Sequence, residues 1–178
     1  VMEEQRESFI TGALNNQIQQ ETAEATFAMI EKFAGYGFNK SHSAAYALVA
    51  YQTAWLKTHY PAEFMAAVLT SEMQYTDKVV LLLNECKNTL KLKVHWPDVN
   101  RSYYEFTVNA EGALVYGLGA IKGMGQGPAQ ALLHAREQGG PFQHLSDFCQ
   151  RVEIKKFNRR LLDTLAHAGA LDQLYAPN

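Results

Sequence analysis

Apolar positions recur with the 3.6-residue period of an α-helix along the first half of the chain. The pattern predicts helices over residues 21–34, 41–57, 61–73 and 76–88. Gly35 and Gly37 are expected to end the first of them in turn conformations. The second is apolar all round its first half, which favours burial. The fourth is predicted to turn Val79, Val80, Leu83 and Cys86 inward. These helices indicate one compact helical unit.

The pattern changes near residue 88. Apolar and polar residues alternate in two stretches between residues 92 and 118, and Asn109 to Gly112 supply turn chemistry, so a short strand and a hairpin are predicted. A glycine-rich turn then precedes a helix with Pro128 in its first turn, and a last helix is closed by Gly169. The expected fold class is mainly α with a small β element.

Composition limits the function classes. The chain has 178 residues, of which 47% are hydrophobic and 19% charged, which is typical of a globular protein. Its net charge is −2, but residues 117–178 carry seven Lys and Arg against five Asp and Glu. The apolar run from Ala44 to Leu56 is too short for a bilayer span, so no membrane partner is expected. Cys86 and Cys149 stand alone, which argues against a disulfide framework and is compatible with a reducing cytoplasm.

The glycine-rich turn carries the first candidate chemistry. Met124 lies between Gly123 and Gly125; both glycines are expected to adopt positive φ while Met124 plugs the core. With Lys122, Gly127 and the following helix start, the turn is suited to bind a DNA phosphate without reading base sequence. A β-branched residue at Gly125 is therefore expected to do more damage than loss of any one lysine. A purely structural glycine pair is the alternative.

A basic cluster follows at the start of the last helix. It consists of Lys155, Lys156, Arg159 and Arg160, and it favours a tandem helix-hairpin-helix unit, although a solvated helix face explains the same charges. No Gly-Lys-Ser/Thr sequence is present, which excludes a P-loop. Neither histidines at i, i+4 spacing nor a C-x-x-C pair is present, so no metal site is predicted.

Several of these stretches resemble one known family. They are FAGYGFNKSHSAAYALVAYQTAWLKTHYPAEFMAAVLTSEM, WPDVNRS, YGLGAIKGMGQGP and NRRLLDTLAHAGALD. Together they closely resemble the C-family replicative DNA polymerases, the family of the bacterial DNA polymerase III alpha subunit, over essentially the whole chain. The resemblance implies that residues 1–88 are the distal fingers and residues 89–178 a tandem helix-hairpin-helix domain that grips duplex primer–template DNA. Thr89 to Lys91, where the family usually has a glycine, and Trp96, where it often has a proline, depart from the pattern.

The resemblance also implies a nucleotide site. Asn39, Lys40, Ser41 and His42 would contact the incoming deoxynucleoside triphosphate or the neighbouring template strand. The paired aspartates that hold Mg²⁺ lie upstream in the family, and this chain has no Asp-x-Asp. No catalytic residue, metal ligand or cofactor is therefore expected here, and the chain alone is expected to be inactive. In the full-length protein, the sliding clamp and the proofreading subunit are the implied further partners.

Two other function classes stay open from the sequence. A stand-alone helix-hairpin-helix module of a repair or nucleoprotein factor would need no nucleotide site. A structural adaptor in a nucleoprotein assembly could use the same folds. The polymerase hypothesis differs from both because it requires paired aspartates elsewhere in the full-length protein.

Overall fold

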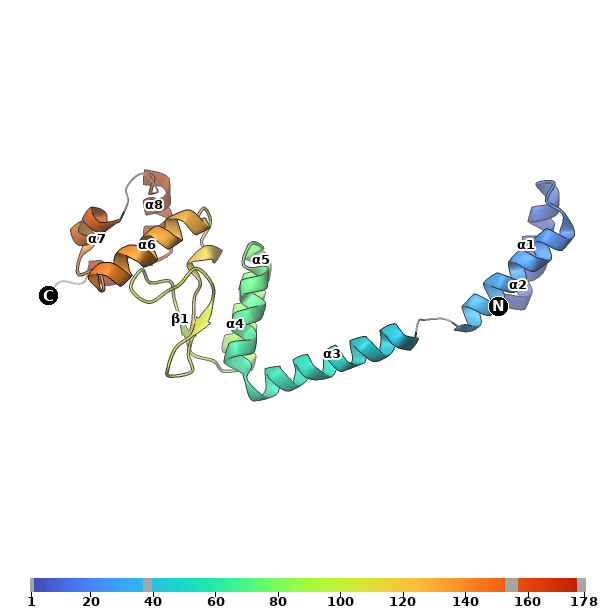
Figure 1. The fold of residues 1–178 in the computed structure, drawn as a ribbon, viewed down its shortest axis with the longest axis horizontal. Helices are drawn as coiled ribbons and strands as arrows, with labels where there is room; N and C mark the ends of the chain where they lie inside the picture. Colours follow the sequence, from blue (N-terminus) through green and yellow to red (C-terminus); the bar gives the residue numbers. More distant parts are fainter. Residues whose placement is uncertain (1, 37–39, 153–156, 176–178) are drawn as a thin grey trace. The chain divides into compact units, whose positions relative to one another are not determined.

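The computed structural model describes residues 2–36, 40–152 and 157–175, and most of them are helical, as predicted (Figure 1). The helices are α1 (Met2–Asn15), α2 (Gln20–Tyr36), α3 (Lys40–His59), α4 (Pro61–Glu72), α5 (Thr76–Asn84), α6 (Gln126–Gly139), α7 (Leu145–Arg151) and α8 (Arg159–His167). Shorter helical turns are η1 (Glu85–Thr89), η2 (Leu118–Ala120) and η4 (Asp172–Leu174). The strands are β1 (Val94–His95), β2 (Thr107–Val108) and β3 (Leu114–Val115).

The first compact unit, residues 1–53, contains the antiparallel pair α1 and α2. Its small core holds Phe27, 4% exposed, whose ring lies 5.4 Å from that of Phe9. Helix α2 continues through Gly35, so the expectation that this glycine ends the helix is wrong. A glycine inside a helix costs only about 1 kcal/mol, which neighbouring helix formers can offset. Gly37 lies outside the described residues.

Helix α3 has the predicted position but not the predicted burial. None of its residues is buried in the described part of the chain. Its exposed large apolar side chains are Tyr46, Leu48, Val49, Tyr51, Trp55 and Leu56. Burial was expected because apolar groups surround the helix, but such a pattern indicates no particular face and no particular neighbour. The burial prediction is therefore wrong for this chain.

The second compact unit, residues 54–178, begins with the last residues of α3, which are followed by α4 and α5, two helices that lie side by side (Figure 1). Met65 and Leu69 of α4 are 1% and 0% exposed and share a core with Leu114 of β3. The Thr70 hydroxyl accepts a hydrogen bond from the Phe106 N–H at 3.1 Å. Val80, which the pattern turned inward, is 53% exposed. Only Val79 and Leu83 of α5 are buried in this core, so the apolar stripe of the helix is wider than its buried face.

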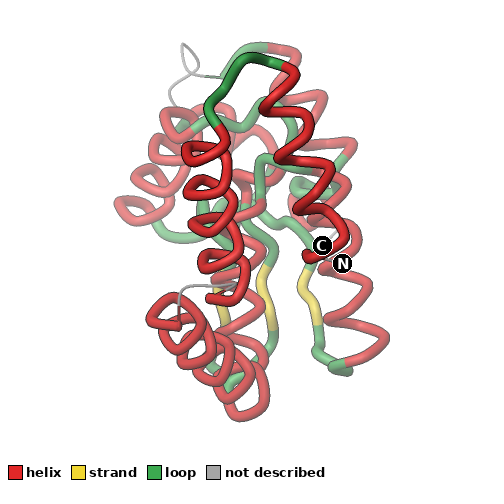
Figure 2. The backbone as a smooth tube through the Cα atoms, turned by 90° about the vertical axis from the view of Figure 1, so that its right-hand side faces the viewer, coloured by secondary structure: helices red, strands yellow, loops and turns green. Residues whose placement is uncertain are grey.

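The predicted strand and hairpin form a three-stranded sheet in the order β1-β3-β2 (Figure 2). Strand β3 is parallel to β1 and antiparallel to β2, with Val115 opposite both His95 and Thr107. The turn between β2 and β3 is confirmed: the Asn109 side chain accepts from the Ala113 N–H at 2.8 Å, and Gly112 has a φ of +75°.

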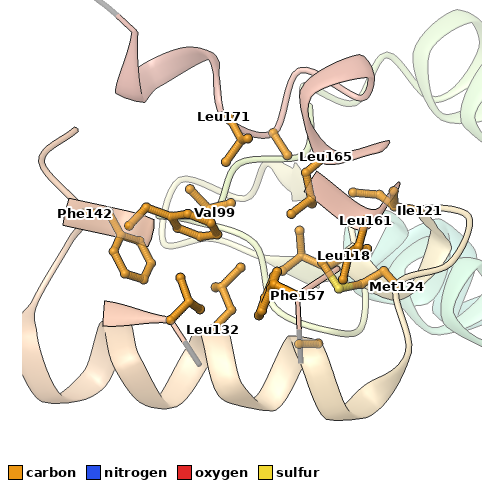
Figure 3. Packing of buried hydrophobic residues seen from close by; sticks show 14 of the residues in the cluster. Val99, Leu118, Ile121, Met124, Leu132, Phe142, Phe157, Leu161, Leu165 and Leu171 are labelled. Carbon is orange, nitrogen blue, oxygen red and sulfur yellow. The ribbon is translucent and has the colours of Figure 1, made fainter. Parts of the chain in front are cut away.

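A second core joins the loop after β1 to the last three helices. Val99, Leu118, Leu132, Phe148 and Leu165 are all 0% exposed within it. Figure 3 shows side chains from η2, α6 and α8 pointing into this core. The mainly α fold with a small β element is therefore confirmed.

The sequence-based domain boundary near residue 88 does not coincide with the division of packing. Helix α4 packs against β2 and β3 inside residues 54–178, and α5 packs against α4 and shares the same core, because the sheet would otherwise leave its apolar face in water. The assignment of 1–88 and 89–178 as separate domains stays a prediction about function.

Candidate nucleic-acid interface

The glycine-rich turn links η2 to α6. The chain reverses at Gly123, whose φ of +87° lies in the left-handed region, and the Met124 N–H donates to the Ile121 carbonyl at 2.9 Å. Met124 is 3% exposed, which confirms the predicted plug, while Lys122 and Gly125 are exposed. The turn therefore presents backbone and one cation to solvent.

Gly125 does not have the expected positive φ. Its φ of −79° and ψ of 170° are extended backbone, and it forms the N-cap of α6. A Cβ added there would lie 3.9 Å from the Pro128 Cδ, which is ordinary van der Waals contact. The expectation of positive φ is therefore wrong for Gly125. Since a β-branched residue is strained only where φ is positive, that argument applies to Gly123 instead.

The start of α6 can offer backbone donors to an anion. Helical geometry leaves the N–H groups of Gln126 and Gly127 without a carbonyl inside the helix, and no side chain caps this end. Gly127 is exposed, and a Cβ added to it would meet nothing within 4 Å. A phosphate could therefore approach the backbone at the positive end of the helix dipole.

A second helix start lies at α8, which follows α7 along the chain. Phe157 is 4% exposed, and the Asn158 side chain caps α8 by accepting from the Leu161 N–H at 2.8 Å. Arg159 and Arg160 follow in the first turn and are exposed. Sequence reasoning missed this cap, although an asparagine directly before a basic and apolar run is a helix-start signal.

One core fixes both helix starts. Met124 before α6 and Phe157 before α8 point into it together with Leu118 and Leu161 (Figure 3). Because protein cores are close-packed, the two helix starts keep a defined spacing. Lys122, Arg159 and Arg160 form no ion pair with another described residue, so their charges are available to a ligand.

The structure describes three of the four residues that were predicted to contact the nucleotide. Lys40, Ser41 and His42 form the first turn of α3, which contains no acidic residue, and all three are exposed. The His42 ring lies 4.2 Å from the Tyr46 ring, centroid to centroid. Asn39, and likewise Lys155 and Lys156 of the basic cluster, lie outside the described residues.

The loop after β1 is held to α6 and to the loop before α7 by side-chain hydrogen bonds, which the hydrophobic periodicity did not predict. Asn100 exchanges two hydrogen bonds with the Phe142 backbone, at 2.9 and 2.8 Å. The Arg136 guanidinium donates to the Val99 and Ser102 carbonyls, both at 2.9 Å. The Pro-Asp-x-Asn sequence carries a turn signal that could have located this loop. Arg136 thus serves the fold.

The Arg151 side chain likewise stabilises the fold and is not available for a ligand. Its guanidinium donates to the Ala135 and Gly140 carbonyls at 2.6 and 2.7 Å and to the Asp147 carboxylate at 3.0 Å. A hydrogen bond from the Gln143 N–H and the Arg151 guanidinium hold the pKa of Asp147 below its usual value. The net count of basic residues in this region therefore overstates the charge available to DNA.

Two general features bear on ligands. No three His, Cys, Asp or Glu side chains gather into a possible metal site within the described ranges. No helix in the described part of the chain has both the length and the apolar character needed to cross a membrane.

Comparison with known proteins defines the class of this domain. Residues 91–178 match the helix-hairpin-helix motif family. Over 97% of its length, the chain is 60% identical to DNA polymerase III subunit alpha of Pseudomonas aeruginosa, 58% identical to that of Vibrio cholerae and 56% identical to that of Escherichia coli K12. It spans 15% of the length of each of these relatives. The chain is therefore homologous to a segment of the bacterial DNA polymerase III alpha subunits, which confirms the resemblance found in the sequence.

Proposed function

We propose that this chain is the part of a replicative DNA polymerase that grips duplex primer–template DNA. The observation that carries the proposal is the pair of helix starts, α6 and α8, held by one core with Lys122, Arg159 and Arg160 exposed beside them. Backbone N–H groups and cations contact phosphates, which are the same at every base pair. The grip is therefore independent of sequence, as a replicative enzyme requires.

The fingers assignment belongs to the same proposal. The first turn of α3 contacts the incoming deoxynucleoside triphosphate: Lys40 neutralises phosphate charge, and Ser41 and His42 donate hydrogen bonds to phosphate or sugar. Asn39 adds a contact from the preceding loop. The exposed turn, without acidic residues, is suited to an anion. Residues 1–88 act as distal fingers and residues 89–178 as the DNA-binding domain.

Catalysis is proposed to depend on other parts of the full-length protein. Nucleotidyl transfer with Mg²⁺ needs clustered carboxylates, and the described residues gather no such ligand set. The carboxylates present here do not fit the metal site, so no reaction step is assigned to them. The sliding clamp and the proofreading subunit are proposed as partners of the full-length protein, which works in the cytoplasm.

Duplex binding is expected to be weak, sequence-independent and dependent on salt. The chain should bind duplexes of unrelated sequence equally, with a Kd in the range of roughly 10⁻⁴ to 10⁻⁶ M. Replacing Arg159 and Arg160 together by Ala should reduce the slope of log K against log salt by about 1.8, since each phosphate neutralised contributes about 0.9. Fluorescence anisotropy across a salt series measures both quantities.

The matched control removes the same number of charges elsewhere. Arg6 and Lys32 are exposed on α1 and α2, and their double replacement by Ala should leave the slope unchanged. Equal slopes for the two double variants, or no duplex binding at low salt, would contradict the proposed grip.

The nucleotide contact is tested in the full-length polymerase. Lys40→Ala should raise the KM for nucleotide about tenfold, since it removes a charge-assisted hydrogen bond of about 1.5 kcal/mol, and should leave primer–template affinity unchanged. Lys32→Ala, an exposed lysine of α2, is the control. If steady-state kinetics give the same nucleotide KM for both variants, Lys40 does not contact the nucleotide and is an ordinary surface lysine.

A further inference from the structure

An exposed tryptophan separates two depressions on the surface of the second unit. Trp96 is 57% exposed, and it borders one depression of about 340 Å³ and another of about 220 Å³. Tyr116 and Ala120 line both, so the two depressions share a floor. We call this surface the Trp96 groove. One half is closed by Val79, Val80 and other residues of α5 and the other by the second half of α8.

The groove is positively charged and apolar at once. The Lys87 ammonium lies 3.7 Å from the centre of the Trp96 ring, and Lys122 lines the opposite half. No aspartate or glutamate lines either depression within the described ranges. Neither lysine forms an ion pair with another described residue. The surface therefore complements a ligand that carries both negative charge and flat apolar groups.

Lys122 connects the groove to the proposed duplex contact. It lies in the glycine-rich turn beside Gly123, and the two residues together line a third depression next to this turn. This third depression is lined by no described aspartate or glutamate and shares Ala120, Ile121 and Lys122 with the Trp96 groove, so a strand that leaves the duplex at the glycine-rich turn could continue into the groove.

We propose that the Trp96 groove binds unpaired nucleotides of single-stranded DNA. Bases stack on exposed aromatic rings or enter apolar depressions, while Lys87 and Lys122 contact the phosphates between them. A duplex keeps its bases stacked inside and offers only phosphates, so it would leave the indole and the apolar floor unused. The inference rests on the proposed function only for the position of the duplex beside Lys122.

The test uses the whole chain and a labelled oligothymidylate. The chain contains two tryptophans, so Trp55→Phe leaves Trp96 as the only fluorescent indole. Oligothymidylate should quench its emission. Trp96→Ala should weaken oligothymidylate binding about tenfold, and Lys87→Gln should reduce the salt slope by about 0.7. Duplex affinity should stay within about twofold in both variants, since neither side chain lies at the start of α6 or α8.

Tyr75→Ala is the matched control. Tyr75 is 60% exposed, Lys78 lies 4.7 Å from its ring centre, and it lines neither depression. This variant should bind oligothymidylate as the parent does.

Three results would overturn the inference. They are the absence of quenching, an equal loss of duplex affinity in Trp96→Ala, and competition by polyglutamate as strong as that by unlabelled oligothymidylate, which would indicate an acidic-peptide site. If oligothymidylate binding depends on Trp96 while duplex binding is absent, the groove assignment stands and the proposed duplex grip fails.

Discussion

Gly123→Val is expected to lower the affinity of the chain for duplex DNA about tenfold, which corresponds to 1.4 kcal/mol of binding free energy. Gly123 has a φ of +87°, where a β-branched residue is strongly disfavoured. Valine would force the turn to another conformation and carry the Gln126 and Gly127 N–H groups away from the phosphate. The free energy of unfolding should also fall, by about 1 to 2 kcal/mol.

The control exploits the difference between the two glycines of the turn. Gly125→Ala keeps an allowed backbone, since φ is −79°, and its Cβ meets only Pro128 at 3.9 Å. It should retain parental stability and most of the duplex affinity. Anisotropy and thermal unfolding of Gly123→Val, Gly123→Ala and Gly125→Ala make the comparison. Equal behaviour at both positions would show that the left-handed residue does not set the shape of the hairpin.

Arg151→Ala should cost about 3 kcal/mol of unfolding free energy. The change removes donors from the Ala135 and Gly140 carbonyls and breaks the pair with Asp147, and a lost charged hydrogen bond costs about 1.5 to 3 kcal/mol. Urea unfolding followed by circular dichroism measures this loss. Arg101→Ala is the matched control, because Arg101 is 60% exposed and pairs with Asp98 at 3.5 Å; it should cost under about 1 kcal/mol.

Gly139 allows a stricter test of the same contact. A Cβ added to Gly139 would lie 2.6 Å from Nη2 of Arg151, too close to be accommodated while the guanidinium keeps its hydrogen bonds. Gly139→Ala should therefore destabilise the parent but not Arg151→Ala, where alanine's better helix propensity acts alone. Additive effects of the two substitutions in a double-mutant cycle would show that Arg151 does not hold the end of α6.

The glycine-rich turn and the arginine contacts differ in how much of their structure the local sequence predicts. The glycines around Met124 predict a turn with an apolar plug, but the sequence does not say which glycine is left-handed, because either could be. Arg151 and Arg136 look like basic residues of a DNA-binding surface. Their guanidinium groups donate instead to carbonyls of α6, the loop after β1 and the loop before α7, which lie 11 to 37 residues away in the sequence.

The sequence by itself determined the helical periods, the turn at Asn109, the glycine-rich start of α6 and the kinship with polymerase alpha subunits, because these depend on neighbouring residues or on extended identity. Only the tertiary structure decided that α4 and α5 share a core with the sheet and that one core holds the starts of both α6 and α8. The tertiary structure also decided that the residues of α3 are not buried and that Trp96 lies between two depressions. These features depend on which apolar faces meet, and hydrophobic burial is non-directional, so a pattern shows that a face needs covering without naming its partner.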